Sequence, residues 1–350
     1  MTDANPHDPG PDLAAATFEG PADIAANPLH VGRATAGRTS ADGPTPGTIR
    51  IGTASWTDPT MTAAGVFYPN GADSAEERLQ YYAATFPVVE VDATYYALPA
   101  ERTSQLWVDR TPPDFTFDIK AHALMTGQGT ETKRLPKAIR EALPEDQQAK
   151  ARIYAKDMPP ELQDEVWRMF RDGLAPLAER NQLGSILLQY PKWVFPSNEN
   201  RALIEEAAER LKGWTVAVEF RNGSWLNEKN VERTTRFLAE RNIPFVMVDE
   251  PQGFKSSLPP ETLVTSSDLA LVRFHGRNAD TWEKKGITPA ERFRYLYSRD
   301  ELAEWLPRIK EAASEAREVH LMFNNCYANY GTTNAREIAA LLFDLEAGQN

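Results

Sequence analysis

Short runs of β-branched and aromatic residues recur eight times along the chain, and nearly all of them end on a polar or charged side chain. Segments with helical periodicity separate most of these runs. This alternation predicts parallel strands joined by helices, and eight such strands suit a closed α/β barrel. The predicted strands span residues 49–54, 88–92, 115–120, 185–190, 215–220, 244–249, 270–275 and 319–324.

Helix boundaries follow from capping residues and prolines. Ser74 and Glu77 form a capping box for a helix that ends near residue 86, and residues 99–110 form a second helix before a Thr-Pro-Pro stop. A late helix begins at Ser298, and Pro307 is expected to kink it or end it early. Further helices are expected at about 161–180, 200–211, 228–241 and 333–345.

Two segments depart from this rhythm. Residues 1–47 are rich in Pro, Gly and Ala without apolar periodicity, so we expect a disordered tail before a single domain over residues 48–350. Residues 124–160 form a long charged insertion after the third strand, with one helix expected at about 136–150. Because the insertion follows a barrel strand, it is either a lid over the C-terminal face or a mobile surface insert.

Composition narrows the range of partners. The net charge of −12 argues against sequence-independent nucleic-acid binding over the whole surface, although it leaves room for a local basic pocket. The single cysteine, Cys326, fits a reducing compartment. No apolar run approaches the ~18 residues of a membrane helix, and the N-terminus lacks the pattern of a secretory signal. We therefore expect a cytoplasmic protein without membrane contact.

The strand ends lie within nine phrases that occur in a fixed order. They are IGTASW (51–56), FYP (67–69), FPVVEVDATYY (86–96), TPPDFTFDIK (111–120), LGSILLQYP (183–191), VEFRNGSW (218–225), VRFHGRN (272–278), RYLYS (294–298) and FNN (323–325). Together they resemble the YecE-like family, the domain of unknown function seventy-two, over about residues 49–345. The resemblance implies a TIM-type barrel and supplies no reaction.

Two features depart from that family pattern. Asp92 stands where the family tends to keep an asparagine, and the insertion after the third strand is longer than the usual spacing. Each of these differences is expected to alter the preference for a ligand.

The chemistry of parallel barrels lies at the C-terminal ends of the strands. Three strand ends carry polar residues two positions apart, which places both members of each pair on one face. The pairs are Lys120 with His122, Glu219 with Arg221, and Arg273 with His275. Together they predict a cationic mouth for a small anionic or phosphorylated ligand, and Trp56, Asp92, Gln189 and Asn324 are further expected contacts.

Several functions suit such a mouth. The first is a hydrolase acting on phosphoesters, with Glu219 and His275 in acid–base roles and Asp249 orienting a base or a water. The second is a module that binds nucleic acid or a nucleotide without chemistry, through arginines and aromatic rings. A purely structural alternative also exists, in which Glu219 and Asp249 neutralise the cations in an ion-pair network.

A metal-dependent isomerase or endonuclease is a third function, with Glu219, Asp249, His122 and His275 as ligands. Against it, the chain has no His-x-His or His-Glu-x-x-His spacing, and neighbouring cations would repel a divalent metal. We therefore expect no metal and no other cofactor. Phosphate-loop, dinucleotide-binding and nucleophile-elbow motifs are absent from the sequence as well.

Overall fold

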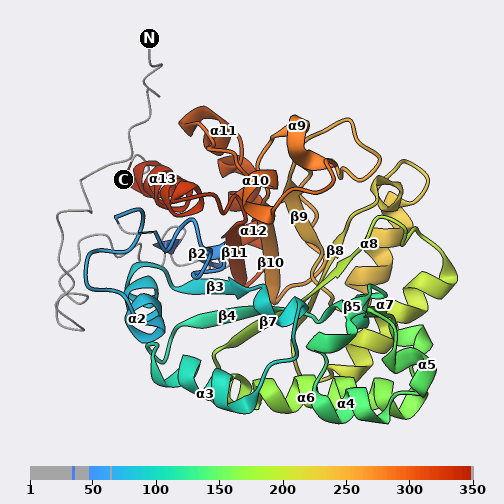
Figure 1. Cartoon of the computed structure of the whole chain (residues 1–350). Helices are drawn as coiled ribbons and strands as arrows, with labels where there is room; N and C mark the ends of the chain where they lie inside the picture. Colours follow the sequence, from blue (N-terminus) through green and yellow to red (C-terminus); the bar gives the residue numbers. More distant parts are fainter. Residues whose placement is uncertain (1–33, 36–46, 64, 348–350) are drawn as a thin grey trace.

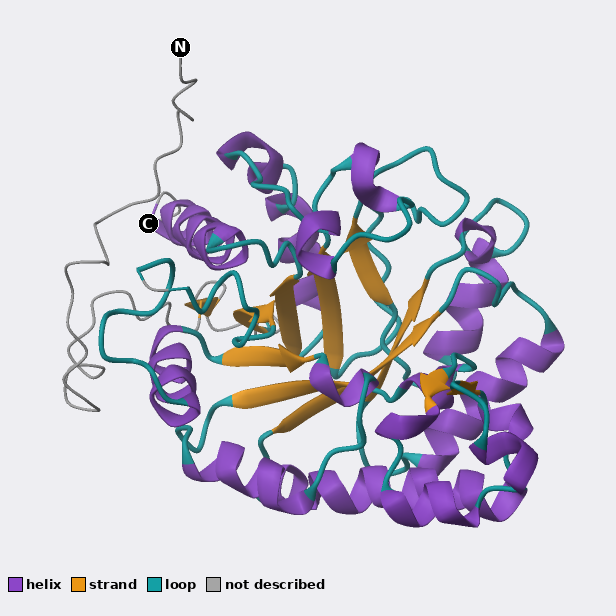
Figure 2. Cartoon of the chain, viewed as in Figure 1, coloured by secondary structure: helices purple, strands orange, loops and turns teal. Residues whose placement is uncertain are grey.

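Eight parallel strands form the centre of the molecule (Figures 1 and 2). The structure is a computed structural model and describes residues 34–35, 47–63 and 65–347. All eight predicted strands are present, each within two residues of its expected bounds. They are β2 (Thr48–Ala54), β3 (Val88–Val91), β4 (Thr116–Lys120), β7 (Leu183–Tyr190), β8 (Val216–Phe220), β9 (Val246–Asp249), β10 (Leu269–Phe274) and β11 (Glu318–Phe323).

The strands follow the order β8-β7-β4-β3-β2-β11-β10-β9, which places β8 and β9 at the two edges of the sheet. A single bridge between Val218 and Phe245 joins these edges, and the Val218 N–H donates to the Pro244 carbonyl at 2.9 Å. The fold is therefore a nearly closed TIM-like barrel, as the sequence predicts, with one thin seam between β8 and β9.

Helices surround the strands (Figure 2). The longer ones are α2 (Ala75–Thr85), α3 (Glu101–Asp109), α6 (Pro160–Glu179), α7 (Asn198–Arg210), α8 (Val231–Ala239), α12 (Leu306–Glu315) and α13 (Tyr330–Ala347). Short helices are α9 (Ala279–Trp282), α10 (Pro289–Arg292) and α11 (Arg299–Ala303). None of the helices that the structure describes is long and apolar enough to span a membrane.

The predicted capping box of Ser74 and Glu77 is confirmed at the start of α2. Ser298, the predicted start of the late helix, caps α11 reciprocally with Glu301. The late helix is indeed interrupted, because α11 ends at Ala303 and Pro307 lies in the first turn of α12. Proline is tolerated there because the first N–H groups of a helix have no intrahelical acceptor.

The insertion after β4 folds into a small unit. Its strands β5 (Thr130–Glu131) and β6 (Arg152–Ile153) pair antiparallel, and the single helix expected there is instead two, α4 (Lys137–Ala142) and α5 (Glu145–Gln148). The break lies at Pro144, whose ring cannot continue a helix. Helix α4 packs against α6, while Gln128 lies at the barrel mouth and donates to the Gln189 carbonyl. Whether the unit serves as a lid stays a prediction.

Residues 34–35 and 47 of the expected tail lie within the described part of the chain. Ala34 and Thr35 form strand β1, which pairs antiparallel with β2. Backbone pairing with the first residues of β2 needs no apolar periodicity, and no such pattern marks these two residues in the sequence. The rest of the predicted tail, residues 1–33 and 36–46, lies outside the described residues.

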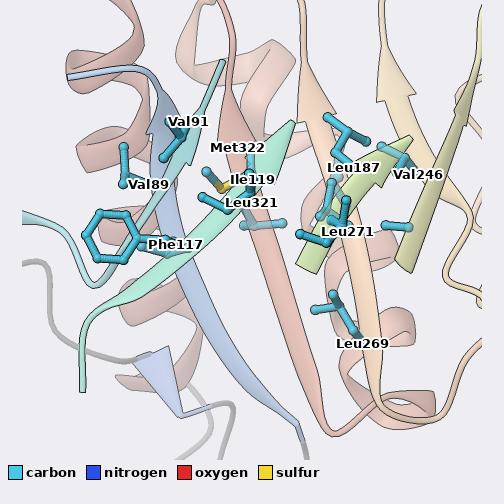
Figure 3. Packing of buried hydrophobic residues seen from close by; sticks show 14 of the residues in the cluster. Val89, Val91, Phe117, Ile119, Leu187, Val246, Leu269, Leu271, Leu321 and Met322 are labelled. Carbon is cyan, nitrogen blue, oxygen red and sulfur yellow. The ribbon is translucent and has the colours of Figure 1, made fainter. Parts of the chain in front are cut away.

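Alternation along the strands divides the apolar residues between the barrel interior and the helix-covered outside. Leu271 pairs with Val246 in parallel register, and Figure 3 shows both near Leu187. Phe117 belongs to the outer set and packs on Trp107 of α3 with ring centroids 5.8 Å apart. Charged residues on the inward-facing positions therefore need partners inside the barrel.

Candidate functional site

A buried ion pair crosses the barrel below its C-terminal mouth. The Arg273 guanidinium on β10 donates from Nε and Nη2 to the two carboxylate oxygens of Glu90 on β3, at 2.7 and 2.6 Å. Its Nη1 donates to Glu219 Oε2 on β8. Arg273 and Glu90 are each 1% exposed and Glu219 is fully buried. Three of the five guanidinium N–H groups therefore donate to protein carboxylates, and the side chain is buried beneath the mouth.

Arg221 extends this arrangement towards the groove above it. Its Nε lies 2.6 Å from Glu219 Oε1, and its Nη1 lies 3.0 Å from Glu250 Oε2. Its Nη2 lies 3.0 Å from His275 Nε2. Glu90, Glu219, Glu250, Arg221 and Arg273 together are called the mouth network below. Three carboxylates and two guanidinium groups alternate in it. Most of this cluster therefore matches the structural alternative, in which carboxylates neutralise the cations in an ion-pair network.

Glu219 is held as an anion. Burial alone would raise the pKa of its carboxyl, but Arg221 and Arg273 outweigh that effect and hold the pKa well below its usual value. Gln189 on β7 also donates to Glu219 Oε1 at 2.8 Å. A carboxylate with this many donors is a poor general acid or base, because a proton would have to displace two guanidinium contacts.

His275 is buried at the end of β10 and is held neutral. Burial and the neighbouring Arg221 lower the pKa of its imidazole well below the usual value. Arg221 can only donate, so His275 Nε2 accepts from it, and the other ring nitrogen, Nδ1, lies 2.9 Å from Asn324 Nδ2. The structure thus brings Glu219, Arg221, His275, Gln189 and Asn324 together, and their role in a site stays a prediction.

Lys120 differs from the two arginines. Among the residues that the structure describes, its ammonium forms no hydrogen bond and no ion pair, and it lies 4.9 Å from the centroid of the Tyr95 ring. Burial and Arg273 lower the pKa of Lys120, against the opposing effect of Glu90, Glu219 and Asp92. The side chain is only half-buried, so it remains accessible from the mouth.

Asp92 lies beside Lys120 at the end of β3. Burial raises the pKa of its carboxyl, while the Lys120 charge acts in the opposite direction. Both residues are half-buried, in contrast to Arg273 and the three carboxylates of the mouth network, which are buried. Lys120 and Asp92 are therefore ionisable groups of the mouth that remain accessible.

A groove of about 490 Å³ opens over the same end of the barrel. It is called the mouth groove below, and Gln128, Gln189, Lys192, Trp193, Arg221, Trp282, Lys284, Lys285 and Arg292 line it together with Pro191, Ser256, Glu283 and Phe293. Trp193 is 58% exposed on its rim. The lining carries more cations than anions, which supports the prediction of an anionic ligand although the whole chain is acidic.

The predicted catalytic role of Asp249 does not agree with its position. Its carboxylate accepts from Arg277, from the Tyr297 hydroxyl at 2.7 Å and from the Trp305 indole at 2.7 Å. The strand register explains this position, because Val248 pairs with Arg273, whose side chain points into the barrel. Side chains alternate along a strand, so Asp249 points outward to α12 and Glu250 points inward again. Asp249 fixes loops on the outside of the barrel instead.

Two further predicted contacts lie away from the mouth network. His122 is fully buried and caps a short 3-10 helix, with its Nδ1 accepting from the Leu124 N–H; burial lowers its pKa to about 4. Trp56 packs edge-on against Trp107 and Phe117 on the outer side of the barrel. The alternation that placed Lys120 and His122 together ends at Lys120, the last residue of the strand.

The same positions remove the metal set suggested by the sequence. Glu219 and His275 lie 3.3 Å apart, but Asp249 faces outward and His122 caps its own helix. No group of three or more His, Cys, Asp or Glu side chains within the described ranges is arranged to hold a metal ion. Burial also raises the pKa of the Cys326 thiol to about 12, which disfavours the thiolate that a nucleophile or metal ligand requires.

Sequence reasoning missed Glu90 and Glu250. Glu90 interrupts the apolar run VVEV of β3, and a charge within a buried strand was a signal that it has a buried partner. Glu250 directly follows Asp249, and only the strand register shows which of the two faces inward. Burial raises the pKa of Glu250 to about 7, although Arg221 opposes this.

Comparison with known proteins places the chain in a family. The family described as "Protein of unknown function DUF72" matches residues 50–348. The chain belongs to this family. A DUF72 protein of Thermotoga maritima MSB8 has a solved structure that is 30% identical, with a TM-score of 0.66 over 84% of this chain and 99% of that one. This agrees with the resemblance in the sequence and with the barrel.

Two other similar proteins agree with this family membership. The UPF0759 protein YunF of Bacillus subtilis (strain 168) is 30% identical over 301 residues, which are 85% of this chain and 95% of that protein. A DUF72 protein of Enterococcus faecalis V583 has a crystal structure that is 27% identical, with a TM-score of 0.64 over 84% of this chain and 97% of that one. None of these names states a reaction.

Proposed function

We propose that the protein is an enzyme that acts on a small anionic substrate, such as a phosphoester, at the C-terminal barrel mouth. The observation that carries this proposal is that the Lys120 ammonium group forms no ion pair. Arg221 and Arg273 form ion pairs with Glu219, Glu90 and Glu250. The Lys120 ammonium forms no ion pair with a carboxylate among the described residues, although the charges of Glu90, Glu219 and Asp92 act on it. An anionic group of a substrate is the partner that the geometry leaves open to it.

The roles of the residues are revised accordingly. Lys120 would bind the anionic group, and Asp92 would accept a proton from an attacking water. In hydrolysis the water oxygen forms the new bond to phosphorus, the ester P–O bond breaks, and the leaving oxygen takes up a proton. The mouth network, with Glu219 and His275, would fix the position and charge of Lys120 from below, and the cations of the mouth groove would attract the substrate.

A panel of phosphoesters tests this proposal with wild type, Lys120→Met and Lys192→Met. Lys192 is the matched control, because it is an exposed lysine that lines the mouth groove, whereas Lys120 does not line it. Loss of kcat/KM by about 10²–10⁴-fold in Lys120→Met, with a small change in Lys192→Met, is the expected result. Equal turnover by wild type and Lys120→Met would remove Lys120 from the mechanism.

A second candidate is a non-catalytic module for a nucleotide or a single nucleic-acid strand. Trp193, 58% exposed, favours it, because this ring lies beside Lys192 on the rim of the mouth groove. Exposed aromatic rings next to cations provide stacking and phosphate contacts. Titrating labelled oligonucleotides at several salt concentrations decides the matter: affinity that falls with salt and is lost in Trp193→Ala supports this function, and no binding at low salt excludes it.

A further inference from the structure

A second groove lies on the outside of the barrel, and residues of helices α7 and α8 line it. Figure 1 shows these helices among those around the strands. The groove has a volume of about 340 Å³, and arginine is its commonest lining residue. The four arginines are Arg201, Arg233, Arg236 and Arg241. Only two carboxylates, Glu205 and Glu240, line the groove with them, so its local charge is positive on an acidic protein.

Both carboxylates are engaged by the same arginine. Arg241 lies 2.5 Å from Glu205 and 3.5 Å from Glu240. Arg236 pairs with Glu232 at 3.3 Å, one turn away on α8. These contacts leave Arg201 and Arg233 without a carboxylate partner among the described residues.

Arg201 is the unusual member of the group. It is 7% exposed, and its Nε and Nη2 are buried with no hydrogen-bond partner. Its guanidinium lies 5.5 Å from the Trp225 ring and 6.0 Å from the Phe237 ring. Aromatic faces attract the flat side of a guanidinium, but they leave its N–H edge without acceptors. A buried charge in this state is costly unless another group completes it.

Arg233 completes the geometry from the neighbouring helix. It is exposed, and its Nη2 donates to Asn198 Oδ1 at 2.9 Å, which ties the beginning of α8 to the beginning of α7. Both arginines lie near the N-terminal turns of their helices, where the helix dipole disfavours cations and favours anions. Two cations are thus held where an anion is the stabilising partner.

We propose that this α7–α8 groove is a second ligand site, distinct from the barrel mouth, in which Arg201 and Arg233 bind a phosphate group. A phosphate suits the site because its several oxygens accept from more than one guanidinium at once. The site goes beyond the proposed function, since it lies on the outer helices and shares no lining residue with the mouth groove.

Calorimetric titration with inorganic phosphate at constant ionic strength tests the proposal. The Lys120→Met variant is expected to keep the phosphate binding of the α7–α8 groove, because Lys120 belongs to the mouth and does not line this groove. Arg201→Met keeps an unbranched side chain over Trp225 and is expected to weaken binding at least tenfold. Arg168→Met, an exposed arginine of α6, is the matched control and is expected to leave binding unchanged. A parallel titration with a nucleoside monophosphate shows whether free phosphate or a phosphate ester is preferred.

Retention of wild-type phosphate binding by Arg201→Met overturns the proposal, as does the absence of binding to wild type at millimolar phosphate. Arg233→Gln guards against a folding defect in Arg201→Met, because Arg233 is exposed and its replacement leaves the core intact. Several-fold weaker binding by Arg233→Gln supports the site, and unchanged binding counts against it. Loss of binding in Lys120→Met alone would assign the phosphate to the mouth and refute the second site.

Discussion

Arg273 and Glu90 form a two-pronged ion pair inside the barrel, with donor–acceptor distances of 2.7 and 2.6 Å between β10 and β3. Both residues are 1% exposed, so neither charge has water as an alternative partner. Removing one partner of such a pair leaves an uncompensated buried charge. Replacing either residue should therefore lower the free energy of unfolding by an amount that can be measured.

Glu90→Gln is expected to lower the free energy of unfolding by about 3–5 kcal/mol. Urea unfolding followed by circular dichroism gives the value. Glu228→Gln is the control, because Glu228 is exposed, and its effect is expected to stay within about 0.5 kcal/mol. Similar stabilities for the two variants would show that Glu90 is not paired as described.

Asp249→Asn separates structure from catalysis. The Asp249 carboxylate accepts from Arg277, Tyr297 and Trp305 on the outside of the barrel, so this variant is expected to lose about 1.5–3 kcal/mol of stability. The folded fraction is expected to keep wild-type kcat and KM for a phosphoester that wild type cleaves. A fall in kcat without a change in stability would restore the catalytic role predicted from the sequence.

His320 introduces a pH dependence of stability. It lies 2.8 Å from Asp118 and 3.2 Å from Glu318, and these carboxylates raise its pKa to about 9 although burial alone would lower it. The folded pKa is above the unfolded value near 6.5, so the stabilisation is complete below pH 6.5 and disappears as the pH rises through 9. Its size is about 3 kcal/mol, because one pKa unit is worth about 1.4 kcal/mol.

Thermal or urea unfolding of wild type and His320→Gln from pH 4 to 10 checks this expectation. The difference between the two proteins should shrink as the pH rises from 6.5 to about 9. His122→Gln is the internal control with the opposite sign, because burial lowers the His122 pKa to about 4. The contribution of His122 is present above pH 6.5 and is lost as the pH falls towards 4. A pH-independent difference for His320→Gln would contradict the buried imidazolium.

Glu219 and Glu250 both contact Arg221 and are nevertheless expected to titrate apart. Burial raises the pKa of Glu250 to about 7, whereas Arg221 and Arg273 hold that of Glu219 well below its usual value. Carbon-13 spectra of glutamate-labelled protein should show one side-chain carboxyl with a midpoint near pH 7, and Glu250→Gln should remove it. Since the folded pKa of Glu250 is raised, its contribution to stability declines between pH 4.5 and 7.

Much of the fold was accessible from the sequence because strand ends are marked twice, by an apolar run and by the polar residue that follows it. Lys120, Gln189 and Asn324 were placed correctly for this reason. The capping boxes at Ser74 and Ser298 were equally direct, since their hydrogen bonds are local in sequence.

The pairing of charges was not accessible, because it depends on the register between distant strands. Glu90 and Arg273 are 183 residues apart, and no local pattern links them. The strand register also decides which of the neighbours Asp249 and Glu250 faces inward, since a shift of one residue exchanges the inner face for the outer face. The surroundings of Arg201 could not be predicted from composition either, because only the packing of two helices brings its neighbours together.

The seam between β8 and β9 has a consequence for how the barrel opens. One bridge at Val218 joins these strands, and just above it the Arg221–Glu250 ion pair spans their C-terminal ends. Hydrogen exchange should therefore be fastest along this pair of strands, where the fewest bonds must break. An anion that competes for Arg221 would remove the upper tie, so occupancy of the mouth and opening of the seam would be thermodynamically coupled, each promoting the other.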